Sequence, residues 1–279
     1  MKEPKVRLDI LLVERGLAET REKAKRAIMA GIVYSNEERL DKPGDKVAAS
    51  IPLTIKGKQM PYVSRGGYKL EKALKAFNLS VQDKVLIDIG SSTGGFTDCA
   101  LQNGAKYSYA VDVGYNQLAW KLRNDDRVVV MERTNFRYLK PEDLSRELPE
   151  FAVIDVAFIS LRLILPTLKK LLVNNGDVIA LIKPQFEAGK ELVGKKGIVR
   201  DPKVHFQVIN DIVHFSLQEG YDVDHLTYSP ITGGDGNIEF LLHLKWSSEK
   251  EKGDNNLTVS VDNVVAEAHN QLKAGKREE

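Results

Sequence analysis

The middle of the chain alternates short apolar runs with amphipathic stretches, a pattern that predicts parallel strands joined by helices. Residues 85–89 read Val-Leu-Ile-Asp-Ile, a nearly uninterrupted apolar run typical of a strand that is buried on both faces. Further strands are predicted at residues 107–113, 128–131, 152–155, 178–182, 221–228 and 238–244, and helices at 118–123, 161–173 and 203–219. This alternation predicts an α/β fold with a doubly wound sheet. The last two strands are joined by a turn over 230–236 without a helix, so the final strand is predicted to be antiparallel.

The first sixty residues have a different pattern, which is typical of a small α+β domain. Apolar residues repeat at helical spacing before Gly16, and Thr20 is positioned to cap a second helix that ends at Gly31. Short strands are predicted at 32–34 and 51–55. The predicted organisation is a small domain over 1–60, the sheet domain over 61–246, and a polar tail with room for one helix over 247–279.

Composition excludes several classes of protein. A hydrophobic content of 42% with 29% charged residues excludes disordered and fibrous chains. The single cysteine, Cys99, excludes an internal disulfide, and the charged start lacks the apolar core of a signal peptide, so a cytoplasmic location is predicted. The apolar stretches are too short or too interrupted to span a bilayer. The five histidines lack ligand spacing, so no metal site is predicted.

The net charge of +2 conceals an uneven distribution along the chain. Residues 1–62 hold thirteen Lys and Arg against nine Asp and Glu, while the remainder is slightly acidic. The helix predicted after Thr20 carries four cations, Arg21, Lys23, Lys25 and Arg26. These side chains would meet phosphates if that face bound a nucleic acid, although a merely solvated face has the same composition. We favour nucleic-acid binding.

A glycine-rich loop follows the apolar run and precedes a helix predicted to begin near Phe96. The loop consists of Gly90, Ser91, Ser92, Thr93, Gly94 and Gly95. In an open α/β sheet, ligands bind beyond the carboxyl ends of the strands, where this loop would lie. The spacing matches neither a dinucleotide fingerprint nor a phosphate-binding loop, and the loop has no basic residue, so a polyphosphate fits poorly. The loop therefore predicts a ligand other than a dinucleotide or a polyphosphate.

Two acidic residues near the loop indicate which ligand is expected. Asp88 lies two residues before the loop, and Asp112 ends the next strand, where a carboxylate can accept hydrogen bonds from ribose hydroxyls. An adenosine-type ligand with a cationic amino-acid end suits this acidic setting. Phe96 and Phe158 could line the ligand cleft or pack in the core, and the core is the favoured interpretation for both.

Four segments together resemble the TlyA (haemolysin A-like) family of S-adenosylmethionine-dependent ribosomal RNA 2'-O-methyltransferases, whose catalytic domain is of the FtsJ type. They are residues 63–70, 88–97, 112–114 and 132–135. The resemblance extends from about residue 6 to residue 246 and includes a front module similar to the RNA-binding domain of ribosomal protein S4. It implies a Rossmann-like methyltransferase sheet, S-adenosyl-L-methionine as cofactor, and ribosomal RNA or ribosomal subunits as partner. The chain departs from the family pattern at Asn36-Glu37, in the loop over 233–237, and after Trp246.

The resemblance also implies roles for individual residues. The Lys-Asp-Lys-Glu set of FtsJ-type enzymes corresponds to Lys69, Asp155, Lys183 and Glu239. Strand ends would bring the last three to the edge of the sheet that carries the glycine loop, and Lys69 would arrive from a preceding helix. Asn135 would contact the adenine or simply turn the chain. The implied RNA-binding residues are Arg7, Arg21, Lys23, Lys25, Arg26 and Arg65.

The expected chemistry needs alignment and the removal of one proton, because a ribose hydroxyl is a weak nucleophile and a methyl group on a sulfonium is already activated. Lys183 would accept the hydroxyl proton as a neutral amine, or stabilise a developing alkoxide as an ammonium. Asp155 and Glu239 would orient the two lysines. The alternatives without a catalytic role are a solvent-exposed lysine at 183, a helix cap at 155 and a surface charge at 239.

Two other functions compete with the enzyme. One is a non-catalytic RNA-binding factor for ribosome assembly that retains the cofactor fold, and the intact four-residue set argues against it. The other is a haemolysin-like, membrane-active protein, which lacks a spanning helix or a strongly amphipathic basic segment in this sequence. The sequence does not determine the modified nucleotide, the ribosomal subunit or the oligomeric state.

Overall fold

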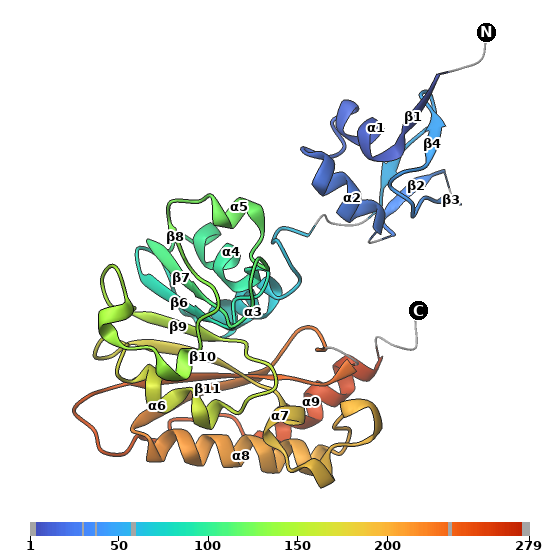
Figure 1. The fold of residues 1–279 in the computed structure, drawn as a ribbon. Helices are drawn as coiled ribbons and strands as arrows, with labels where there is room; N and C mark the ends of the chain where they lie inside the picture. The colour runs from blue at the N-terminus through green and yellow to red at the C-terminus, as the bar shows by residue number, and fades with distance from the viewer. Residues whose placement is uncertain (1–3, 30, 37, 57–59, 234–235, 275–279) are drawn as a thin grey trace. The chain divides into compact units, whose positions relative to one another are not determined.

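The computed structural model describes residues 4–29, 31–36, 38–56, 60–233 and 236–274. The chain divides into two compact units, residues 1–61 and 62–279, which are coloured blue and cyan-to-red in Figure 1. No helix in these described ranges is long and apolar enough to cross a membrane.

The first unit packs two short helices against small antiparallel sheets. Its elements are β1 (Lys5–Arg7), α1 (Leu8–Glu14), α2 (Arg21–Met29), β2 (Val33–Ser35), β3 (Glu38–Arg39), β4 (Lys46–Ala48) and β5 (Thr54–Ile55). Strand β1 pairs with β4, and β2 pairs with both β3 and β5. The predicted helix signals are confirmed: the hydroxyl of Thr20 accepts a hydrogen bond from the Lys23 amide (3.2 Å), and Gly16 and Gly31 have positive φ angles of 68° and 69°. Glu37 of the Asn36-Glu37 turn and residues 234–235 lie outside the described residues.

The second unit is built on a seven-stranded sheet in the order β11-β12-β10-β9-β6-β7-β8. Its strands are β6 (Val85–Ile89), β7 (Tyr107–Val111), β8 (Val128–Met131), β9 (Phe151–Ile154), β10 (Asp177–Ile182), β11 (Tyr221–Tyr228) and β12 (Phe240–Trp246). Strands β8, β7, β6, β9 and β10 are parallel, and β12 is antiparallel to both neighbours. The predicted doubly wound sheet with an antiparallel last strand is confirmed.

Helices cover both faces of this sheet (Figure 1). They are α3 (Gly67–Ala76), α4 (Gly95–Gln102), α5 (Trp120–Arg123), α6 (Leu165–Leu168), α7 (Pro184–Glu187), α8 (Pro202–Gln218) and α9 (Val261–Ala274). Alternate residues of β6 point to opposite faces, so Ile87 packs in the layer of α6, α8 and α9, while Leu86 packs in the layer of α3 and α4. Burial on both faces explains the continuous apolar runs of the central strands.

The prediction of one helix over 161–173 is wrong. A 3-10 turn at Leu161–Leu163 is followed by the single-turn helix α6, with Pro166 in its first turn. Proline has no amide hydrogen and its ring clashes with a carbonyl one turn earlier, so it begins a new helix instead of continuing the first. Other boundaries shift by a few residues, and the strand predicted at 51–55 spans only Thr54–Ile55.

The residues after Trp246 belong to the second unit. Helix α9 contacts α8 and β11, and its Val264, Val265 and Ala268 are buried. The segment therefore contributes apolar residues to the core of the sheet domain.

Candidate active site

Four ionisable side chains converge at the carboxyl edge of the parallel strands. Lys69 lies in the first turn of α3, Asp155 follows β9, Lys183 follows β10, and Glu239 precedes β12. The Lys69 ammonium lies 3.2 Å from Asp155 Oδ2 and 2.7 Å from Glu239 Oε2. The Lys183 ammonium lies 2.5 Å from Asp155 Oδ1. The structure thus brings together all four residues expected to form a catalytic set.

The cluster is largely shielded from water. The side chains of Lys69 and Glu239 are only 9% and 2% exposed, and Lys183 is 12% exposed, so the alternatives of a surface charge at 239 and a solvated lysine at 183 are wrong. Burial lowers the pKa of Lys69, but Asp155 and Glu239 outweigh it and the pKa is raised overall. Burial likewise raises the pKa of Asp155, yet the two lysines reverse the effect and lower it. The cluster is therefore a row of ion pairs in which lysines and carboxylates alternate, in the order Lys183, Asp155, Lys69 and Glu239.

A cavity of about 310 Å³ opens beside this cluster. It is lined by the four ionisable residues, by Ser64, Arg65, Gly66, Ala157, Thr232 and Gly233, and by most of the glycine-loop region: Asp88, Gly90, Ser91, Ser92, Thr93, Gly95 and Phe96. The glycine loop and the four-residue cluster therefore share one cavity, at the point where the chain order in the sheet reverses between β6 and β9.

Close backbone approach explains two of the glycines. Gly90 has a φ of +84°, and a Cβ there would lie 2.7 Å from the carbonyl oxygen of Asp155. A Cβ at Gly95 would lie 2.3 Å from Ser64 Oγ and 3.0 Å from the Gly67 amide nitrogen. Glycine at these positions lets the loop contact both the end of β9 and the start of α3, which carry Asp155 and Lys69.

Asp88 has a buried oxygen that no described residue satisfies. Its Oδ2 accepts hydrogen bonds from the amide and hydroxyl of Thr97, at 3.0 and 2.7 Å, whereas its Oδ1 has no partner within the described part of the chain. Burial raises the pKa of this carboxyl to about 7, against the opposing effect of the Thr97 hydrogen bonds. An unsatisfied buried acceptor beside a cavity indicates that a ligand donor or cation belongs there.

Three residues predicted to bind the cofactor are not among the described residues that line this cavity: Gly94, Asp112 and Asn135. Asp112 accepts hydrogen bonds from the Ser92 amide (2.8 Å) and the Gly114 amide (2.7 Å), so it holds the glycine loop. Gly94 has a φ of +90° and faces Leu118 and Leu122. The Asn135 side chain caps a 3-10 turn through the Arg137 amide, which agrees with the alternative that it turns the chain.

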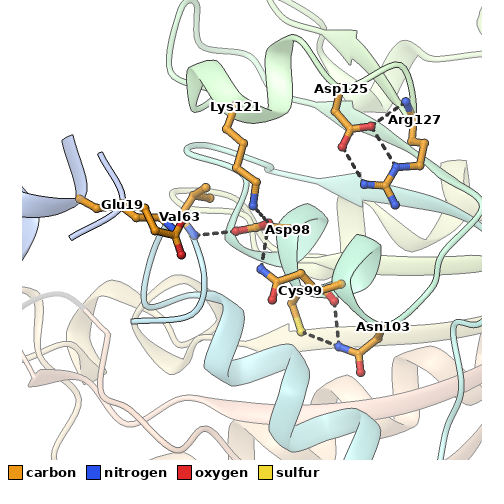
Figure 2. A network of polar contacts seen from close by, with 10 residues as sticks. Glu19, Val63, Asp98, Cys99, Asn103, Lys121, Asp125 and Arg127 are labelled. Carbon is orange, nitrogen blue, oxygen red and sulfur yellow. Dashed lines mark hydrogen bonds and ion pairs between the residues drawn. The ribbon is translucent and has the colours of Figure 1, made fainter. Parts of the chain in front are cut away.

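A polar network that sequence reasoning missed fixes the segment before α3. Asp98, in the first turn of α4, accepts a hydrogen bond from the Val63 amide (2.8 Å) and pairs with Lys121 beside it (3.0 Å) (Figure 2). Its side chain is 3% exposed. This contact positions the residues that follow Val63, including Ser64 and Arg65 of the cavity wall. An acidic residue inside an otherwise apolar helix was the available signal.

The two phenylalanines have opposite environments. Phe96 is buried, as favoured from the sequence, and it also lines the cavity. Phe158 is 91% exposed, so the interpretation as a core residue is wrong. It has a φ of +62° in the loop after Asp155, and its ring lies 5.0 Å from that of Phe186, which follows Lys183. The backbone turn after β9, which the sequence pattern does not reveal, directs this ring outward.

The cations predicted to bind RNA lie in both units. In the first unit, Arg7 and Arg21 bind Asp9, whereas Lys23 and Lys25 pair with exposed glutamates of the same helix region. Arg26 is exposed and makes no ion pair with a described residue. Arg65 is exposed and lines the cavity of the second unit.

Comparison with known proteins agrees with this geometry. A family model described as "FtsJ-like methyltransferase" matches residues 62–246, and one described as "S4 domain" matches residues 6–50. The chain is 69% identical over 276 residues to "Putative rRNA methyltransferase YqxC" of Bacillus subtilis, covering 99% of this chain and 98% of that protein. It is 39% identical over 264 residues to "16S/23S rRNA (cytidine-2'-O)-methyltransferase TlyA" of Mycobacterium tuberculosis, covering 94% and 98%.

A solved structure is similar over the whole chain. The "Putative hemolysin from Streptococcus thermophilus" has a TM-score of 0.78 and 55% sequence identity, covering 99% of this chain and 100% of that one. The resemblance inferred from the sequence motifs is thereby confirmed. The chain belongs to the FtsJ-like methyltransferases, as a member of the TlyA family in which an S4 domain precedes the methyltransferase domain.

Proposed function

We propose that this methyltransferase transfers a methyl group from S-adenosyl-L-methionine to a ribose 2'-hydroxyl of ribosomal RNA. The observation that carries the proposal is the shared cavity, in which a glycine loop on one side faces Lys183 and its charged neighbours on the other. The S4 domain and the rRNA methyltransferase names of the relatives support RNA as the substrate. A ribosomal substrate would place the protein in the cytoplasm, as we predict from the sequence.

The cavity residues fit a cofactor with a cationic amino-acid end. The unsatisfied Oδ1 of Asp88 offers a buried acceptor, and Gly90 and Gly95 let the loop approach Asp155 and the start of α3 in the cavity wall. When bound, S-adenosylmethionine supplies a methyl group activated by its positive sulfur. Asp112 and Asn135 remain predicted cofactor residues, and Asp112 would act at least by holding Ser92 in place. Calorimetry on Asp112→Ala tests that role.

Lys183 is proposed to handle the proton of the 2'-hydroxyl. It lies in the cavity wall, and its amine can accept a proton once it has lost its own. The new oxygen–carbon bond forms as the sulfur–carbon bond breaks, and the hydroxyl proton passes to the amine. The resulting ammonium group of Lys183 then pairs with Asp155 Oδ1, which lies 2.5 Å from it in the structure.

Lys69 and Glu239 are proposed to position Asp155. Lys69 bridges the two carboxylates and, together with Lys183, lowers the pKa of Asp155 against the effect of burial. The second oxygen of Asp155 then remains directed at Lys183. Because Lys69 is buried beside Glu239, its ammonium is a fixed part of the site.

Two exposed residues suit an RNA substrate: Arg65 in the cavity wall and Phe158 in the loop after Asp155. Arg65 lines the cavity and offers a planar cation for a phosphate beside the reacting ribose. Phe158 presents an exposed ring beside Phe186, suited to stacking on an unpaired base. Both roles are proposals that follow from exposure and position.

The test is methyl transfer to purified ribosomal subunits with tritiated S-adenosylmethionine, followed by mapping of ribose-methylated positions. The expected result is one labelled methyl group per ribosomal subunit. The RNA chain should resist alkaline cleavage next to the modified nucleotide, because its 2'-hydroxyl is blocked. RNA binding without cofactor consumption would favour the non-catalytic assembly factor instead. Labelling on a base would show that the 2'-hydroxyl assignment is wrong.

A further inference from the structure

Helix α3 meets the end of strand β11 through a contact between a lysine and an aromatic ring. The Lys72 ammonium lies 3.3 Å from the centroid of the Tyr228 ring, well within the range in which a cation is attracted to a ring face. The Tyr228 hydroxyl donates a hydrogen bond of 3.2 Å to Glu267 Oε1 in α9. Tyr228 therefore joins α3, β11 and α9, and none of the three residues is among the described residues that line the cavity.

Both partners of this contact lie close to a residue of the four-residue cluster. Lys72 follows Lys69 by three residues, and side chains at this spacing lie on the same side of a helix. Tyr228 ends β11, and the amide of the next residue, Ser229, donates to the carbonyl oxygen of Glu239 (2.8 Å). The contact therefore lies one helical turn from Lys69 and next to the backbone pairing of Glu239.

The Tyr228 ring is the partner that holds the Lys72 side chain in place. Lys72 makes no ion pair or hydrogen bond with a residue in the parts of the chain that the structure describes, and it is half-buried. Burial lowers its pKa to about 8, against the opposing effect of Glu267. The face of the ring replaces part of the water that burial removes from the ammonium. Loss of either partner would therefore weaken the contact between α3 and β11.

The other end of α3 is fixed to the sheet by a separate contact. Phe77, directly after the helix, stacks on His225 of β11 with 5.2 Å between ring centroids, and on His243 of β12 at 6.0 Å. These rings lie at the end of α3 that is remote from the cluster. At the end that carries the cluster lysine, the helix contacts β11 through Lys72 and Tyr228.

We propose that Tyr228 and Lys72 are positioning residues for methyl transfer. They hold α3 at the distance from β12 that the Lys69–Glu239 ion pair requires. This inference rests on the proposed function, because it assumes that Lys69 and Glu239 serve the reaction. Their contact is 2.7 Å long and buried, so a small shift of α3 would separate two buried charges and move Lys69 relative to Asp155.

Single-turnover methyl transfer to ribosomal subunits tests this inference. Lys72→Met retains an unbranched side chain but loses the charge over the ring, and we expect a rate about tenfold below wild type, since a misplacement of about 1 Å can cost about a hundredfold. Tyr228→Leu should be slowed by a similar factor. Tyr228→Phe retains the ring, so its rate should stay within about threefold of wild type. Calorimetry should show unchanged affinity for S-adenosylmethionine in all three variants.

Tyr221→Phe is the matched control, because it removes a hydroxyl from the same strand. That hydroxyl donates to the carbonyl oxygen of Leu165 (2.8 Å) in α6, on the face of the sheet opposite α3. The control should lose stability without losing rate. Wild-type rates in both Lys72→Met and Tyr228→Leu would overturn the inference.

A double variant tests whether Lys72 acts through the ion pair. In a Glu239→Gln background, Lys72→Met should slow transfer no further, because the pair that it positions is already lost. A further loss of about tenfold would show that Lys72 acts independently of Glu239, and the inference would be wrong.

Hydrogen exchange measured by mass spectrometry reports on the position of α3 without any activity. The amides of residues 67–76 should exchange faster in Lys72→Met than in wild type, while those of α8 should be unchanged. Unchanged exchange in α3 would overturn the inference. Absence of methyl transfer by the wild type would instead refute the proposed function, and the exchange data would still show whether Lys72 holds α3.

Discussion

Replacement of Lys183 separates chemistry from stability, because the structure leaves Asp155 with a second partner. Lys183→Ala removes the amine 2.5 Å from Asp155 Oδ1, while Lys69 remains 3.2 Å from Oδ2. The expected cost in unfolding free energy is about 1.5–3 kcal/mol, the range for one hydrogen bond to a charged group. Complete loss of a partner from a buried charge would cost about 3–5 kcal/mol. The variant should therefore fold.

The effect on methyl transfer should be much larger than the effect on folding. Loss of a general base slows the step by at least about a hundredfold, or about 2.7 kcal/mol in the barrier. Lys183→Arg retains the charge and can still pair with Asp155, but a guanidinium does not give up its proton near neutral pH. It should be as slow as the alanine variant.

The assay is single-turnover transfer of a tritiated methyl group to ribosomal subunits with protein in excess. Calorimetry with S-adenosylmethionine is the control, and the affinity should stay near wild type in both variants. An arginine variant at close to the wild-type rate would refute the base role and leave Lys183 as a fixed cation. A fully active alanine variant would remove Lys183 from the chemistry.

Three further outcomes are expected. Because burial raises the pKa of Asp88 to about 7, S-adenosylmethionine affinity should rise with pH up to about 7, as the carboxylate that pairs with the cationic ligand forms, and then level off. Calorimetry should show that Asp88→Asn loses this dependence, and an unchanged profile would exclude Asp88. In Gly95→Ala, the added Cβ meets Ser64 and the Gly67 amide, so the unfolding free energy should fall by about 1–3 kcal/mol in denaturant titrations and the cofactor should bind more weakly. Wild-type stability and affinity would contradict this close approach. Arg65→Met should raise KM for ribosomal subunits without a change in cofactor affinity, and an unaltered KM would place the phosphate contact elsewhere.

The order of motifs along the chain was enough to predict the sheet and the convergence of the site. Strand 85–89 is recognisable because a strand covered on both faces must be apolar, and the glycine loop follows it directly. Parallel strands end at the same edge, so residues such as Asp155 and Lys183 are brought together by topology alone. For these features, local pattern and global fold give the same answer.

Contacts between distant segments decided what the sequence did not. Pro166 divided the expected helix, and an outward turn exposed Phe158, because both depend on the backbone path between elements. The partners of Lys69, Asp155 and Glu239, are distant in the sequence and meet it only in the folded unit. The pattern of apolar residues in the sequence indicates which residues are buried, but it does not indicate which buried charged side chains form ion pairs with one another. Those pairings determine how the charges of the site are arranged, and tertiary packing alone sets them.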